Sequence, residues 1–175
     1  MGMSTAELEA FLAQTFPTPR GVIATVRRDG SPHIVPVWFR WEAGAVTIWT
    51  TETRTWVRNL LRDPRVAFSV QTFEEPYPAV MIRGIATVAT ADDAATAGEI
   101  RAITRRYIVP EEVEGYIARW PDLRTIVTIV PVHIVSWSGE DEILWAVAVA
   151  GQSRPGRTRP HPADPGLQVG VSDSQ

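Results

Sequence analysis

The sequence predicts a mainly β domain with helices, an α+β fold in which short antiparallel strands form a small barrel. Six or seven short segments rich in β-branched residues recur along the chain. Turn signals such as Asp29-Gly30 separate the first of these segments. A few helical segments fall between the strands, which favours a barrel with helical covers.

The N-terminal part is predicted to contain one helix and three strands. Ser4 and Glu7 have the spacing of a capping box, and apolar residues follow at helical spacing, which predicts a helix over residues 5–15. The three strands that follow are expected over residues 21–27, 33–41 and 45–51. Because tight turns join them, we expect an antiparallel meander.

A short helix follows the third strand and ends at Asp63-Pro64, because proline disfavours helix both at its own position and before it. Residues 66–72 and 79–90 are the next expected strands, with a loop over residues 73–78. Gly84 lies inside the second of these strands and indicates a bulge or a close backbone approach.

The rest of the chain is predicted to contain two helices and then more strand. The helices are expected over residues 92–107 and 111–119. Pro131 separates the β-rich residues 124–130 and 132–137, which form either one kinked strand or two short ones.

The last part of the chain is harder to interpret. Residues 143–150 fit either a last strand or a helical turn. Residues 151–175 are rich in Pro, Gly, Ser and Arg, so we expect a flexible tail that could order against a partner subunit. The expected organisation is therefore one domain over residues 1–150 and a tail over residues 151–175.

Composition excludes several classes of function. The net charge of -3 argues against general nucleic-acid binding, and clustered arginines in an acidic chain suit a small anion better. The chain has no cysteine, so disulfides, thiolate metal sites and cysteine nucleophiles are excluded. Its three histidines, His33, His133 and His161, lack familiar metal spacings, so we expect no metal. No apolar run reaches membrane-spanning length and no signal-peptide pattern is present, so we expect a cytoplasmic protein.

The turn into the short arginine-rich helix is the first candidate for a binding site. Arg54, Arg58 and Arg62 recur at every fourth position, where like charges repel. Arg54 lies in the expected first turn, where the helix dipole disfavours a cation. Free backbone N–H groups, Thr50, Thr51 and these arginines together indicate a phosphate site. A solvated arginine stripe is the alternative interpretation.

Tryptophans near this turn suggest an apolar wall. Trp38 and Trp49 are expected on adjacent strands, and Trp56 on the helix that follows. They are either core residues or a surface on which a planar heteroaromatic ligand stacks. Pro36 interrupts its strand, which leaves backbone groups free for a ligand or marks an ordinary barrel edge.

The chain resembles the pyridoxamine 5'-phosphate oxidase-like split β-barrel family. Residues 21–39 resemble the family's opening strands, and residues 58–66 (RNLLRDPRV) resemble its "RNLRRDPRV" block. Residues 84–86 (GIA) resemble its "GxA" strand, and residues 130–137 (VPVHIVSW) its closing strand. The likeness is nearest to the branch that uses the deazaflavin coenzyme F-420.

The resemblance implies a homodimer of FMN-binding-like split barrels with two cofactor sites at the subunit interface. The family's phosphate-binding turn corresponds here to Thr50, Thr51, Arg54 and Arg58. The cofactor ring would rest against the strand that holds Pro36, Val37 and Trp38. Many relatives have a lysine where this chain has Trp56, so one cation of the phosphate site is missing here. The full set of candidate cofactor-binding residues is Pro36, Val37, Trp38, Trp49, Thr50, Thr51, Arg54, Thr55, Trp56, Arg58 and Asn59.

We therefore expect an F-420-dependent reductase that transfers hydride from the reduced coenzyme to a small unsaturated organic substrate. The cofactor would supply the chemistry, and the sequence indicates no catalytic acid or base. One alternative is an FMN-binding oxidoreductase of the same fold. Another is a non-catalytic protein that binds a flavin or a tetrapyrrole.

Overall fold

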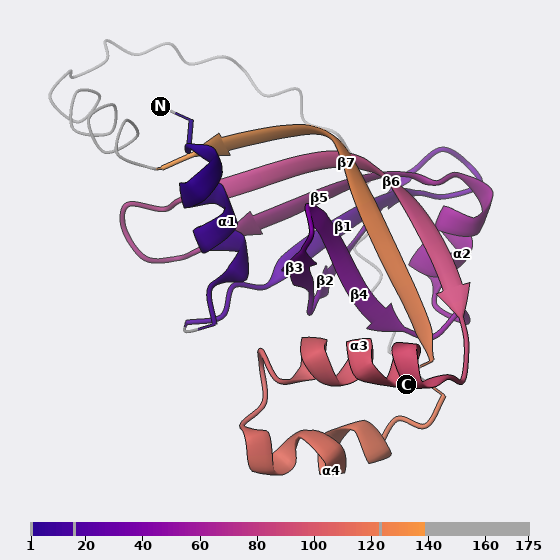
Figure 1. Ribbon diagram of the computed structural model, residues 1–175. Coiled ribbons are helices and arrows are strands. Elements are labelled where there is room, and N and C mark those ends of the chain that lie inside the picture. The colour runs from indigo at the N-terminus through magenta and orange to yellow at the C-terminus, as the bar shows by residue number, and fades with distance from the viewer. Residues whose placement is uncertain (1, 16, 123, 139–175) are drawn as a thin grey trace, which may run out of the picture.

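The computed structural model describes residues 2–15, 17–122 and 124–138 of the chain (Figure 1). Its strands form one antiparallel seven-stranded sheet in the order β2-β1-β5-β6-β7-β4-β3. The strands are β1 (Gly21–Val26), β2 (Pro32–Val37), β3 (Arg40–Glu42), β4 (Ala45–Thr50), β5 (Arg65–Gln71), β6 (Ala79–Thr90) and β7 (Thr125–Trp137). The helices are α1 (Thr5–Ala13), α2 (Thr55–Arg62), α3 (Ala94–Thr104) and α4 (Val113–Ala118), with a 3-10 turn, η1 (Pro110–Glu112), before α4.

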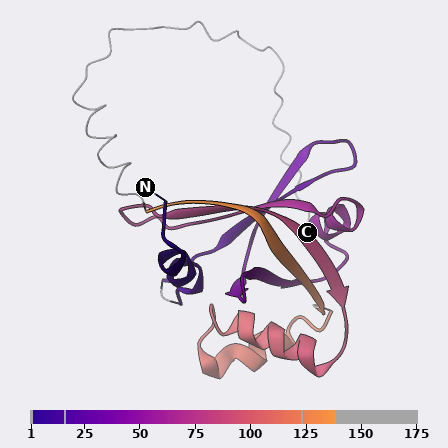
Figure 2. The ribbon, with the colours of Figure 1, turned by 45° about the horizontal axis from the view of Figure 1, so that its top comes forward.

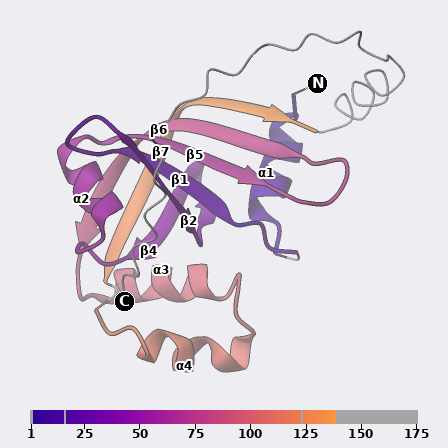
Figure 3. The same ribbon diagram turned by 180° about the vertical axis from the view of Figure 1, so that it is seen from behind.

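The sheet coils around one main core, and the helices cover its open sides. Helices α1 and α2 lie at opposite ends of the coiled sheet and both pack into the main core, whereas α3 and α4 lie together below it in Figure 1 (Figures 1 and 3). The turned view shows how strongly the sheet curves (Figure 2). The largest fully buried side chains are Phe39, Phe68, Leu12, Ile23, Ile48 and Ile82, together with further Ile and Val residues. The predicted mainly β split barrel with helical covers is thus confirmed.

The predicted strand over residues 33–41 is wrong in one important respect, because it is two strands. Strand β2 pairs with β1, and β3 pairs with β4. The break lies at Trp38 and Phe39, where the Phe39 N–H donates to the Tyr107 hydroxyl at 3.1 Å. The Phe39 carbonyl accepts from Arg106 Nη1 at 2.7 Å. Since side chains satisfy both backbone groups of Phe39, the strand ladder cannot continue through it.

This break also corrects the predicted three-stranded meander. The first hairpin, β1–β2, and the second, β3–β4, do not pair with each other, and they lie at opposite ends of the sheet order. A seam therefore runs between edge strand β2 and the β4–β3 end of the sheet, without ladder hydrogen bonds across it.

Strands β6 and β7 form the longest pairing and carry the predicted irregularity. The register shifts between Arg83 and Gly84. A Cβ atom on Gly84 would lie 2.7 Å from the Val130 carbonyl oxygen, which confirms the expected close approach. Of the two alternatives for residues 124–137, the structure shows one strand, and Pro131 is tolerated next to the bulge.

The remaining predicted elements are present: β6 has the predicted bounds, β5 is shifted by one residue, and the helices α1, α3 and α4 are shorter than predicted. Ser4 and Glu7 form the predicted capping box, but α1 ends at Ala13. Helix α3 begins after Asp93, whose Oδ1 accepts from the Thr96 N–H at 2.7 Å. The predictions for residues 143–150 and for the tail lie outside the described residues. No helix in the described part of the chain is long and apolar enough to cross a membrane.

Candidate functional site

A cavity of about 510 Å³ opens at the seam between β2, the end of β4 and the start of α2. It is lined by His33, Val35, Pro36, Val37, Trp38, Trp49, Thr50, Arg54, Thr55, Trp56 and Tyr116. Most of the predicted site residues are therefore brought together in one place. His33, Val35 and Tyr116 are additions that sequence reasoning missed.

The alternation of side chains along a strand could have identified two of these three residues from the sequence. Side chains on one face of a strand recur at every second position, so His33 and Val35 share the face of Val37. The sequence prediction instead named consecutive residues, which point to alternate faces. Tyr116 comes from the distant helix α4, and no local pattern connects it with this cavity.

Three predicted residues lie outside this cavity. Arg58 and Asn59 line a neighbouring hollow of about 380 Å³, which meets the cavity at Thr55. Asn59 is buried and its Nδ2 donates to Thr25 Oγ1 at 3.1 Å, so it braces α2 against β1. Thr51 faces another hollow on the far side of Arg54, and its hydroxyl lies 3.3 Å from that of Thr53.

The start of α2 lacks a side-chain cap, as the sequence predicted, so its first backbone N–H groups are not capped. Arg54 is the N-cap residue, one position before the expected first turn, and it makes no side-chain capping bond. The first turn carries no acidic residue. Free N–H groups and the positive end of the helix dipole therefore point toward the side where Arg54 and Thr55 line the cavity.

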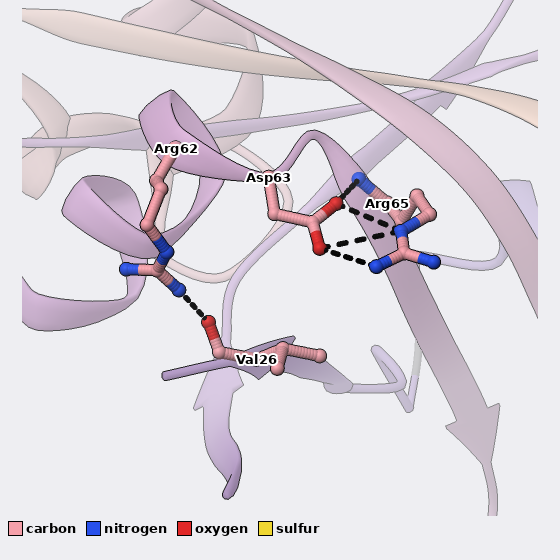
Figure 4. Close-up of polar contacts among 4 residues, drawn as sticks. All are labelled: Val26, Arg62, Asp63 and Arg65. Atoms are coloured by element: carbon pink, nitrogen blue, oxygen red, sulfur yellow. Dashed lines mark hydrogen bonds and ion pairs between the residues drawn. The ribbon is translucent and has the colours of Figure 1, made fainter. Parts of the chain in front are cut away.

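The other arginines near α2 have structural partners. Arg62 donates to the Val26 carbonyl oxygen, which ties the end of α2 to the end of β1 (Figure 4). Arg65 pairs with Asp63, with Nη2 2.7 Å from Oδ2, and its backbone N–H also donates to Asp63 Oδ1 (Figure 4). These bonds from Arg65 lower the pKa of Asp63 to about 2. Of the predicted stripe, Arg54 and Arg58 remain for a ligand, because neither has an ion-pair partner among the described residues.

The predicted aromatic wall is present but is assembled differently. Trp38 and Trp49 are not on adjacent strands, since Trp38 lies in the link after β2 and Trp49 on β4. Tyr116 joins them, with ring centroids 5.1 Å from Trp38 and 6.3 Å from Trp49. Trp56 is 4% exposed and packs in the main core, so the core interpretation holds for most of its surface.

Trp38 is held in place by a network behind the cavity. It stacks on Tyr107 with centroids 4.8 Å apart and rings 4° from parallel. The Tyr107 hydroxyl lies 3.1 Å from the carbonyl oxygens of both Pro19 and Phe39, and its single proton is donated to one of them at a time. Burial raises the pKa of Tyr107, so this hydroxyl stays protonated over the physiological range. Contacts within the protein therefore hold the Trp38 part of the wall in place.

The arrangement can hold a flat molecule that carries an anionic group. Apolar and aromatic side chains from β2, β4 and α4 face one part of the cavity, and the open start of α2 faces another. No carboxylate is among the described residues that line it. Nor do the described residues include a group of three His, Asp or Glu side chains suited to a metal ion.

Comparison with known proteins identifies the family of this fold. Residues 4–138 match the family model described as pyridoxamine 5'-phosphate oxidase. A search of curated proteins found no match to the chain.

Several solved structures share the fold. A conserved hypothetical protein from Mycobacterium tuberculosis is similar with a TM-score of 0.68 and 23% identity, over 93% of this chain and 95% of that chain. An F420 reductase is similar with a TM-score of 0.56 and 25% identity, over 72% of this chain and 94% of that chain. An FAD binding protein from Mycobacterium smegmatis gives a TM-score of 0.54 and 22% identity, over 78% of this chain and 96% of that chain.

Removing the Tyr107 hydroxyl should destabilise the fold while keeping the ring stack on Trp38. In Tyr107→Phe the N–H of fully buried Phe39 loses its acceptor, so we expect the free energy of unfolding to fall by about 1–3 kcal/mol. Urea unfolding measures this change. Tyr77→Phe is the matched control, because Tyr77 is 44% exposed and its hydroxyl makes only a 3.4 Å contact with Glu75. Equal stability of the two variants would contradict the bracing role of Tyr107.

Proposed function

The chain belongs to the pyridoxamine 5'-phosphate oxidase family, and from this premise we propose that it is an oxidoreductase that binds a phosphorylated flavin-type cofactor in the seam cavity. One observation carries the proposal. The uncapped start of α2, with Arg54 and Thr55, opens onto the same cavity as Trp38 and Trp49. A phosphate and a flat ring system need this combination of neighbours.

The residues present fit such a group in size and charge. A volume of about 510 Å³ lies within the range of roughly 300–1,000 Å³ that small-molecule sites occupy. Arg54 and the α2 amides would hold the phosphate, and Thr55 adds a hydroxyl donor. Val37 and the Trp38–Tyr116–Trp49 wall would orient the rings and exclude water.

More specifically, we propose that the cofactor is coenzyme F-420 and that the protein is a deazaflavin-dependent reductase. When bound in its reduced form, the coenzyme supplies a hydride for a small unsaturated organic substrate. The 25% identical F420 reductase supports this choice, because its similarity extends over 94% of that chain. The alternative is an ordinary flavin, such as FMN, and the similarity to an FAD binding protein supports a flavin in general.

Turnover distinguishes a reductase from a carrier. The purified protein is mixed anaerobically with reduced F-420 and a panel of enones, nitro compounds and tetrapyrroles. We expect at least one acceptor to oxidise the coenzyme. The return of the absorbance of oxidised F-420 measures this reaction. Tight binding of F-420 without oxidation by any acceptor would instead favour a carrier protein. This alternative is considered because buried Trp56 stands where many relatives have a lysine.

Loss of Arg54 should weaken cofactor binding specifically. We expect Arg54→Ala to reduce affinity by about 1.5–3 kcal/mol, the range for hydrogen bonds to charged groups, when F-420 and FMN are titrated side by side by fluorescence. Arg105→Ala is the control, because Arg105 is exposed and does not line the cavity. An unchanged affinity of Arg54→Ala would make Arg54 a surface residue only.

We also propose that the protein is a homodimer, as the resemblance implied. A row of outward-facing residues crosses the sheet through the partners Pro36, Val22, Ser69, Met81 and Val135. Val22, Met81 and Val135 in this row are 38%, 48% and 44% exposed. An apolar face of this extent on a sheet favours a covering partner, and a second copy supplies a matching apolar face.

A charge on this face should therefore separate the subunits. We expect Met81→Glu to convert a dimer into a monomer in light scattering coupled to size exclusion, because the carboxylate would be desolvated at the interface. Glu111→Gln is the control, since Glu111 is an exposed residue in η1, away from the sheet. A wild-type protein that runs as a monomer at micromolar concentration would contradict the proposal.

A further inference from the structure

The imidazole of His33 carries a defined tautomer. Its Nδ1 lies 2.8 Å from Nη2 of Arg27. A guanidinium group can only donate hydrogen bonds, so Nδ1 must be the acceptor. The proton of the neutral ring is then on Nε2. Nε2 has no hydrogen-bond partner among the described residues, and His33 lines the seam cavity.

The hairpin turn leaves Arg27 available for this contact. The backbone N–H of Arg27 donates to the Ser31 carbonyl at 2.8 Å, which closes the turn. Asp29, the nearest carboxylate in the turn, is engaged by Ser31 through its N–H at 2.9 Å and its hydroxyl at 2.6 Å. Asp29 Oδ1 is engaged within the turn, and Arg27 forms no ion pair with a described residue. The Nη2 contact of its guanidinium with His33 fixes the orientation of the ring.

His33 lies at the α2 end of the cavity rather than at its aromatic end. It pairs with Thr25 across β1 and β2, and Thr25 receives the hydrogen bond from Asn59 of α2. Trp38 lies five residues further along the chain, about 16 Å away in extended conformation. His33 therefore faces the polar part of the cavity, on the strand side, across from Arg54 and Thr55.

We propose that His33 is a ligand-binding residue that donates its Nε2–H to the phosphate ester of the bound cofactor. This inference rests on the proposed function for the identity of the ligand. Arg27 is a positioning residue, since it touches His33 and not the cavity. The phosphate is then held from two walls, by the start of α2 on one side and by an oriented neutral donor on the other.

The tautomer is tested first, and this test does not depend on any ligand. Nitrogen-15 NMR of the imidazoles in the full chain distinguishes a protonated ring nitrogen from an unprotonated one, and the His33→Gln spectrum assigns the signal. We expect Nδ1 unprotonated and Nε2 protonated at pH 7. Arg27→Met should mix the two tautomers, and Arg27→Lys should restore the wild-type pattern. A proton on Nδ1 in the wild-type protein would overturn the inference.

The binding role is tested with amide side chains that imitate each ring nitrogen. The His33→Gln amide nitrogen can occupy the place of Nε2, whereas that of His33→Asn can reach only the place of Nδ1. We expect His33→Asn to weaken FMN binding roughly 10-fold or more, and His33→Gln to stay within about threefold of wild type. Riboflavin, which lacks the phosphate, should bind all three proteins equally. F-420 and its unphosphorylated deazaflavin core provide the same comparison.

The outcomes separate this inference from the proposed function. If wild-type protein binds FMN or F-420 and His33→Asn binds it equally well, only the role of His33 is overturned. Equal losses for FMN and riboflavin would place His33 against another part of the ligand, and would overturn the phosphate contact. If wild-type protein binds neither cofactor, the proposed function and this inference both fail. Matching circular dichroism spectra and melting temperatures show that the variants are folded.

Discussion

The capture of the Phe39 backbone by Arg106 and Tyr107 is the constraint on which the site depends. Phe39 is fully buried, yet its N–H and carbonyl bond to side chains rather than to a neighbouring strand. Arg106 also binds the carbonyl oxygens of Leu12 and Gln14, at 2.8 and 3.1 Å, so α1 is anchored to the same point. Its guanidinium lies 4.7 Å from the Phe39 ring centroid. Burial of a cation costs free energy unless hydrogen bonds and ring faces compensate for the lost water. Arg106 makes such contacts at the point where the two hairpins separate.

The seam that results gives the cavity two chemically different ends. Edge strand β2 has no ladder partner on its outer side among the described strands, so its inward side chains meet α2 and the aromatic cluster instead of another strand. Trp49 and Tyr116 belong to a second, smaller core with Ile100 and Ile103, which attaches α3 and α4 to the end of the sheet. The helices that cover the sheet therefore also complete the site. One cavity thus offers aromatic side chains for an apolar ring and the start of α2 for a charged group.

The sequence predicted features that depend on neighbours in the chain. The capping box at Ser4, the Asp29-Gly30 hairpin, the end of α2 at Asp63 and the bulge at Gly84 were all found by short-range patterns. The break at Phe39 could not be found in this way, because its cause is a hydrogen bond to Tyr107, far along the chain. A continuous β-rich run over residues 33–41 contains no signal that would separate it into two strands. The pairing of Trp38 with Trp49 through Tyr116 escaped prediction for the same reason.

The charges around the cavity explain why arginines that look alike in sequence differ in role. Arg62 and Arg65 have acceptors within the fold, so they stabilise the end of α2 and the start of β5. Arg54 lies at the uncapped start of the helix, where the helix dipole adds to its charge instead of offsetting it. No carboxylate is among the described residues that line the seam cavity, so an anionic ligand bound there would neutralise this excess of positive charge. The position of Arg54 therefore indicates a ligand site more strongly than the number of arginines does. The fold places its charge beside an uncapped helix start, where no described residue pairs with it.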